Sequence, residues 1–213
     1  MRFLHVMAAF AIAILRLPAC NSASAAELRV LVRTPGGAAI PNAVVTVYPV
    51  SGSHQPVPPT EPLVVAQREI AFDPYVLVAP VGASVTFPNR DTVRHHVYSF
   101  SPAHRFELKL YGREEHRTER FDTVGVVAMG CNIHDAMAAY IDVVDTRFAE
   151  RTDSQGLVVI GDLPGGMATV KVWHPNAKLP GGMLVKTMNL DADTAQELVV
   201  MDLRPSAPGK QNH

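Results

Sequence analysis

A short run in the middle of the chain constrains the fold more than any other feature. Cys131, His134 and Met137 place a thiolate, an imidazole and a thioether at intervals of three residues. Soft sulfur donors combined with imidazole suit copper better than magnesium or calcium. A trigonal copper site needs a second histidine as well as a weak, long axial methionine. The chain must therefore bring another histidine to this run, and His95 or His96, about 35 residues upstream, is the obvious candidate.

The composition favours a globular protein built from short strands. Lys and Arg number 19 against 20 Asp and Glu, so no basic surplus favours binding to nucleic acid. Hydrophobic residues make up 47% of the chain and charged residues 18%, which is enough apolar material for a core. Seventeen prolines and fourteen glycines indicate frequent turns rather than long helices.

The first 26 residues resemble a secretory signal peptide. Arg2 provides a positive charge, residues 6–15 form an apolar run, and Ala23-Ser24-Ala25 is a small-residue cleavage site. The run is too short for a permanent membrane span, and no later segment reaches that length. We therefore expect an exported, periplasmic protein with no transmembrane segment in its mature form. Cys20 follows Leu17-Pro18-Ala19, an atypical lipoprotein site, so a lipid anchor at Cys20 is the alternative.

Export also changes the interpretation of the cysteines. If Cys20 leaves with the signal peptide, Cys131 is alone and cannot form an intrachain disulfide. A lone cysteine in an exported protein is either a reactive liability or a ligand. Its position beside His134 favours a ligand.

The segment 63–145 carries a dense series of candidate strands. In residues 106–110, Phe, Leu and Leu alternate with Glu and Lys, as on a strand with one buried face. Regularly spaced short strands of this kind are typical of a β-sandwich or barrel. Residues 113–120 are charged and aperiodic, and we expect a surface loop there. The expected strands are 63–65, 75–78, 84–87, 96–100, 106–110, 125–129 and 139–144.

Further strands are expected on both sides of this segment. The β-branched and alternating stretches lie at 28–33 and 44–48 before it, and at 157–160, 168–173, 183–190 and 197–203 after it. Residues 51–62 contain Pro, Ser, Gly and Thr and are expected to form an exposed connection. Residues 205–213 are polar and are expected to be a flexible tail.

The middle segment resembles the cupredoxins, the type-1 copper proteins, and most closely their amicyanin and plastocyanin group. In that family an Asn precedes the first His ligand by six residues, and Asn89 stands six residues before His95. The Cys-x2-His-x2-Met spacing of Cys131, His134 and Met137 matches the ligand loop of amicyanins. The whole chain is also similar to cupredoxin-like proteins associated with methylamine utilisation.

This resemblance implies an all-β Greek-key fold with one type-1 copper held by His95, Cys131, His134 and Met137. Adjacent residues in a strand face opposite sides, so only one of His95 and His96 can reach the metal, and the count from Asn89 favours His95. The family carries single electrons and is not enzymatic, and its exported partners include c-type cytochromes and amine dehydrogenases. His96 stands where the family usually has Asn, and Ile133 stands where it often has Pro, which changes how the ligand loop is braced.

The flanks resemble a different family, the carboxypeptidase-regulatory, transthyretin-like β-sandwiches. The resemblance rests on residues 28–48, with their Gly36-Gly37 turn, and on residues 152–173. It implies a cupredoxin domain at 63–145 inserted between two parts of a second sandwich, at 27–62 and 146–204. Two domains in tandem are the alternative.

Two other functions compete with electron transport. The chain could bind copper and hand it on without redox turnover, with the flanking sandwich as a docking module. A cysteine enzyme using Cys131 and His134 is disfavoured, since the sequence offers neither a third catalytic member nor an oxyanion motif.

Overall fold

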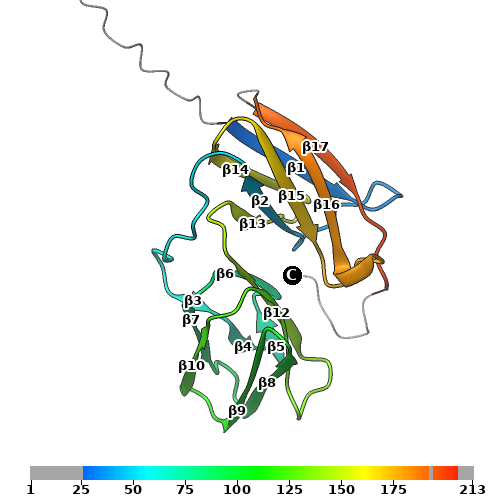
Figure 1. The fold of residues 1–213 in the computed structure, drawn as a ribbon. Coiled ribbons are helices and arrows are strands. Elements are labelled where there is room, and N and C mark those ends of the chain that lie inside the picture. Colours follow the sequence, from blue (N-terminus) through cyan, green and yellow to red (C-terminus); the bar gives the residue numbers. More distant parts are fainter. Residues whose placement is uncertain (1–25, 192–193, 206–213) are drawn as a thin grey trace, which may run out of the picture.

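The computed structural model describes residues 26–191 and 194–205. It confirms the all-β prediction, since seventeen strands form five sheets and the described residues contain no α-helix. A single turn of 3-10 helix, η1 (Pro180–Gly182), joins two of the strands. The sheets gather into two groups, which lie one above the other in Figure 1.

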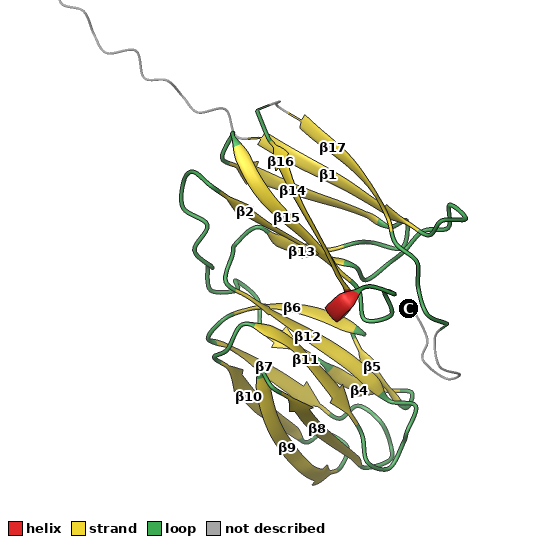
Figure 2. Ribbon diagram, turned by 45° about the vertical axis from the view of Figure 1, so that its right-hand side comes forward, coloured by secondary structure: helices red, strands yellow, loops and turns green. Residues whose placement is uncertain are grey.

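The upper group is a sandwich of two sheets made from both flanks of the chain (Figures 1 and 2). In β1 (Ala26–Arg33), Leu28, Val30 and Val32 are fully buried while the residues between them face outward. This alternation determines which face of the strand packs against the core. β1 pairs antiparallel with β14 and parallel with β17. One sheet has the order β14 (Leu157–Leu163), β1 (Ala26–Arg33), β17 (Thr194–Val200), and the other β13 (Ala149–Arg151), β2 (Val44–Pro49), β15 (Met167–Trp173), β16 (Met183–Asn189).

The lower group is a second sandwich with its own core. Val85, Phe87, Val97, Val127 and Ile141 are fully buried between its two main sheets. The larger sheet has the order β6 (Val76–Pro80), β12 (Ala138–Val144), β11 (Gly125–Gly130), β8 (His95–Ser101), β9 (His104–Tyr111). The smaller sheet has the order β10 (His116–Phe121), β7 (Ala83–Pro88), β3 (Leu63–Val64), and a hairpin of β4 (Ala66–Arg68) and β5 (Ala71–Asp73) completes the group.

A separate apolar cluster joins the two sandwiches. Trp173 and Val44 from the upper sandwich pack with Tyr75 and Val76 from the lower one. The ring of Tyr140, on the outer face of β12, meets Trp173 edge-on with 5.7 Å between ring centroids. The chain connectivity is the one that an inserted sandwich would produce, and the insertion itself stays a proposal.

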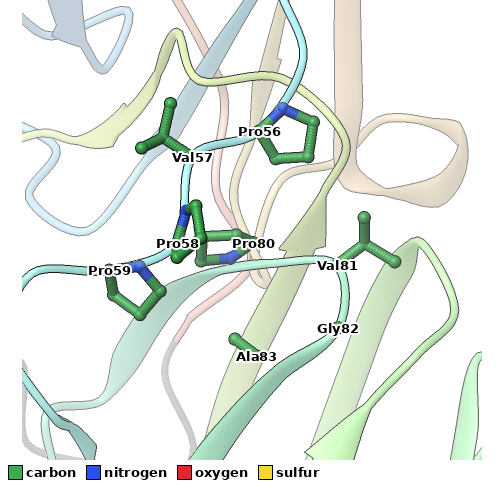
Figure 3. Close-up of a pocket in the computed structure, with 8 residues that line it drawn as sticks. All are labelled: Pro56, Val57, Pro58, Pro59, Pro80, Val81, Gly82 and Ala83. Atoms are coloured by element: carbon green, nitrogen blue, oxygen red, sulfur yellow. The ribbon is translucent and has the colours of Figure 1, made fainter.

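The connection between β2 and β3 lies against the lower sandwich. Residues 56–59 from this connection and residues 80–83 from the β6–β7 turn line an apolar cavity of about 170 Å³. Figure 3 shows the proline rings of both segments lying beside each other there. The proline-rich connection therefore lies beside the β6–β7 turn.

The structure corrects the expectation of a loop at 113–120. Residues 116–121 form β10, an edge strand that pairs antiparallel with β7 along its whole length. Its exposed charged side chains hid the strand period, although they are the residues that protect a sheet edge from unwanted pairing. Phe121 is fully buried and anchors the end of the strand. The short strands β4 and β5 were also not expected.

The predicted terminal segments lie almost entirely outside the described residues. Of residues 1–26, only Ala26 is described, and it is the buried first residue of β1. The signal peptide and Cys20 therefore stay predictions, as does the tail at 205–213, of which only Pro205 is described. Within the part of the chain that the structure describes, no helix is long and apolar enough to cross a membrane.

A buried histidine in the upper sandwich gives a pH prediction. Burial lowers the pKa of His174 from 6.5 to about 4, against a smaller upward effect of a hydrogen bond at Pro41. Between these values the unfolded chain binds a proton that the folded protein does not, so stability falls as pH falls. The Nδ1 atom of His174 accepts a hydrogen bond from the backbone N–H of Asn176. The side-chain oxygen of an asparagine at position 174 can accept the same hydrogen bond.

We therefore expect His174→Asn to reduce the acid sensitivity of folding. Between pH 7 and pH 5 the wild type should lose about 2 kcal/mol more stability than the variant. Urea unfolding of both proteins at the two pH values measures this difference. Parallel pH profiles for the two proteins would contradict it.

Candidate metal centre

Strand alternation in β8 sends two neighbouring histidines to opposite faces of the sheet. His95 is fully buried and faces the core of the lower sandwich. His96 lies on the opposite face of the sheet, where it is also buried, and its Nε2 atom lies 2.9 Å from a carboxylate oxygen of Glu107 on β9. His95 is therefore the histidine that lies beside the Cys131 run.

The other two donors come from the loop between β11 and β12. Cys131 directly follows β11 and is buried, while His134 is partly exposed. The Sγ atom of Cys131 lies 3.9 Å from Nδ1 of His95 and 3.9 Å from Nδ1 of His134. Among residues 26–191 and 194–205, these three side chains form a group whose donor atoms all lie within 4.8 Å of one another.

These distances fit a metal site. When a thiolate and an imidazole bind one first-row metal such as zinc, the angle between the two bonds lies between the tetrahedral and the trigonal value. The sulfur and nitrogen donors are then roughly 3.5–3.7 Å apart. The observed 3.9 Å is close to that range and too long for a strong direct hydrogen bond. One thiolate and two imidazoles suit copper or zinc and do not suit magnesium or calcium.

Met137, the predicted axial ligand, is buried in the same apolar cluster as Cys131. Its backbone N–H donates to the carbonyl oxygen of His134 at 2.9 Å, which closes a tight turn at the end of the loop. This turn brings residue 137 back to the core beside the start of β12. The role of its sulfur as a ligand stays a prediction.

An aspartate that the sequence interpretation missed holds the far side of His95. The Oδ2 atom of Asp91 lies 2.6 Å from Nε2 of His95, and Asp91 is only 12% exposed. Burial alone would raise the pKa of Asp91, but hydrogen bonds from Ile70, His95 and Glu69 outweigh it and hold that pKa below its ordinary value. The carboxylate is therefore charged at neutral pH, and because it only accepts, His95 Nε2 carries the hydrogen. The other ring nitrogen, Nδ1, faces Cys131.

Buried Asn89 shapes the loop that leads to His95. Its side-chain NH2 donates to the carbonyl oxygens of Val93 and Tyr111, at 2.9 and 3.0 Å. Its Oδ1 accepts the backbone N–H of Asp91 at 2.9 Å. Asn89, which stands six residues before His95, therefore fixes the backbone around both Asp91 and His95.

The centre lies close to the surface at the loop that carries His134. Ile133 is 51% exposed beside it, and Asn132, Asp135 and Ala136 are exposed as well. An exposed isoleucine next to a half-buried imidazole gives the centre a small apolar rim.

Comparison with known proteins adds a partial likeness. No protein-family profile and no curated protein matches this chain. Similar solved structures include the copper-containing nitrite reductase from Thermus scotoductus, at 27% identity and a TM-score of 0.38, over 42% of this chain and 25% of that one. They also include a variant of amicyanin in its reduced Cu(I) form, at 21% identity and a TM-score of 0.37, over 47% of this chain and 98% of that one.

The chain thus spans about a quarter of the length of the nitrite reductase. The likeness to both structures covers less than half of this chain.

Proposed function

We propose that this protein binds one copper ion at His95, Cys131, His134 and Met137 and carries single electrons between exported redox partners. The observation that carries the proposal is the convergence of the Cys131 sulfur with two imidazole Nδ1 atoms at 3.9 Å each. Copper bound there would supply the one-electron Cu(II)/Cu(I) couple.

The residues of the chain prepare this centre in three ways. The sandwich holds His95 on a strand, while Cys131 follows directly from the neighbouring strand β11, so two donors sit on or beside rigid elements. The buried setting excludes bulk water from the sulfur. His134, the most exposed of the three donors, provides the route to a partner.

The proposed partner is another exported redox protein, such as a c-type cytochrome or an amine dehydrogenase. The apolar rim beside His134 is small, as expected for a short-lived electron-transfer encounter. We place the protein in the periplasm because of its N-terminal sequence.

Copper titration tests the function directly. Metal-free protein should bind one equivalent of Cu(II) and develop intense visible absorption from the thiolate-to-copper transition. The coloured protein should then be reduced and reoxidised reversibly at an electrode. Tight Cu(I) binding without colour or reversible oxidation would contradict electron transport and favour copper handling.

A further inference from the structure

We propose that Asp91 is a positioning residue that makes the β4–β5 turn part of the copper centre. Its carboxylate connects this turn to the back of His95, so the turn helps to hold the imidazole in place. The inference rests on the proposed copper function, and its tests include one that needs no metal.

The turn between β4 and β5 has an unusual backbone. Glu69 and Ile70 join the two strands directly, with φ angles of 55° and 59°. Two-residue hairpin turns with both φ angles positive usually contain Asn and Gly. The left-handed region costs an ordinary residue about 1–2 kcal/mol, and a β-branched residue such as Ile70 is especially rare there. Such a conformation persists only where the surroundings hold it.

Asp91 provides that hold. Its Oδ1 accepts the backbone N–H of Glu69 at 2.6 Å, and its Oδ2 accepts the backbone N–H of Ile70 at 3.0 Å. Both hydrogen bonds end on an ionised group, which makes them stronger than bonds between neutral groups. The two positive-φ residues thus present consecutive N–H groups to one anion, as backbone nests do.

The same carboxylate holds the metal-facing histidine. Oδ2 also accepts the Nε2 hydrogen of His95 at 2.6 Å, so this one oxygen binds both the turn and the imidazole. A carboxylate oxygen has room for two donors. The hairpin is attached a second time where the backbone N–H of Arg90 donates to the carbonyl oxygen of Gln67 at 2.9 Å. Movement of the turn would therefore move or release the imidazole.

Two consequences follow for the centre. The carboxylate fixes the ring orientation and makes the ligating nitrogen more basic, as outer partners of metal-bound histidines do. Its negative charge also favours the more positive oxidised metal, so Asp91 should lower the reduction potential.

Asp91→Asn tests this role, with Glu107→Gln as the matched control. Both changes convert a carboxylate that is hydrogen-bonded to a histidine into an amide, but Glu107 pairs with His96, which lies on the opposite face of the sheet from His95. We expect Asp91→Asn to weaken copper binding by about 10–100-fold, to raise the reduction potential and to alter the visible spectrum. Glu107→Gln should leave all three near wild type. Equal effects of the two changes, or no change in potential for Asp91→Asn, would overturn the proposal.

Hydrogen exchange in the metal-free protein separates this inference from the copper function. In Asp91→Asn the amides of Glu69 and Ile70 should exchange at least about tenfold faster, since each loses a charge-assisted hydrogen bond. If wild-type protein forms no coloured copper complex, the copper function fails; if exchange at Glu69 and Ile70 is unchanged in Asp91→Asn, the link to the turn fails.

Discussion

Cys131→Ser is expected to abolish the visible colour of the copper-loaded protein and to weaken copper binding more than 100-fold. A hydroxyl oxygen is a harder and much weaker donor than a thiolate, and the charge-transfer transition requires the sulfur. Losing a direct ligand should exceed the roughly 10–100-fold cost of losing an outer hydrogen bond. Absorption spectra and competition titrations with a copper chelator measure both effects.

Met129→Leu is the control for Cys131→Ser. Met129 is buried on the same face of β11, two residues before the cysteine, and leucine has nearly the same volume. This variant should keep the colour and the affinity of the wild type. If the copper-loaded Cys131→Ser protein is still coloured, the visible absorption does not come from the Cys131 thiolate.

Trp173→Ala is expected to lower the free energy of unfolding by about 3–5 kcal/mol, the usual cost of truncating a buried tryptophan. Trp173 is 5% exposed and lies in the cluster that joins the two sandwiches, so the cavity would open at their contact. For a chain of this length the melting temperature should fall by roughly 6–20 °C.

The same substitution should also change the form of the unfolding transition. The two sandwiches have separate cores, and Trp173 is the largest residue in the cluster between them. Calorimetry of Trp173→Ala should therefore show two transitions, while Trp173→Phe should keep more of the coupling. A single unfolding transition, with a free energy of unfolding less than about 1 kcal/mol below that of the wild type, would show that the cluster contributes little to stability.

The parts of the fold that alternate between apolar and polar residues could be predicted from the sequence. β1 and β9 were expected because the period of two is clear in both. β10 was missed because its first five residues are all polar or charged and only Phe121, at its end, is buried, so no apolar alternation marks the strand. β4 and β5 are three residues long, too short for any periodicity to be visible.

The donors of the candidate site could be predicted from the sequence for a different reason. Three of the predicted ligands lie in one run. Strand alternation allowed only one of His95 and His96 to reach the metal, and the spacing from Asn89 favoured His95. Asp91 was not found, because its role depends on the hairpin amides of Glu69 and Ile70, and a Glu-Ile pair gives no turn signal. In the sequence near His95, the only indication of this contact was the spacing of four residues between Asp91 and His95.

The strand order of the upper sandwich affects how the chain folds as it is synthesised. β1 lies between β14 and β17, so both of its partners follow the entire lower sandwich in the sequence. A chain that emerges N-terminus first cannot close this sheet until its last strand is available, whereas residues 63–144 contain all the strands of their own core. The lower sandwich can therefore fold while β1 is still an unpaired edge that needs protection from aggregation.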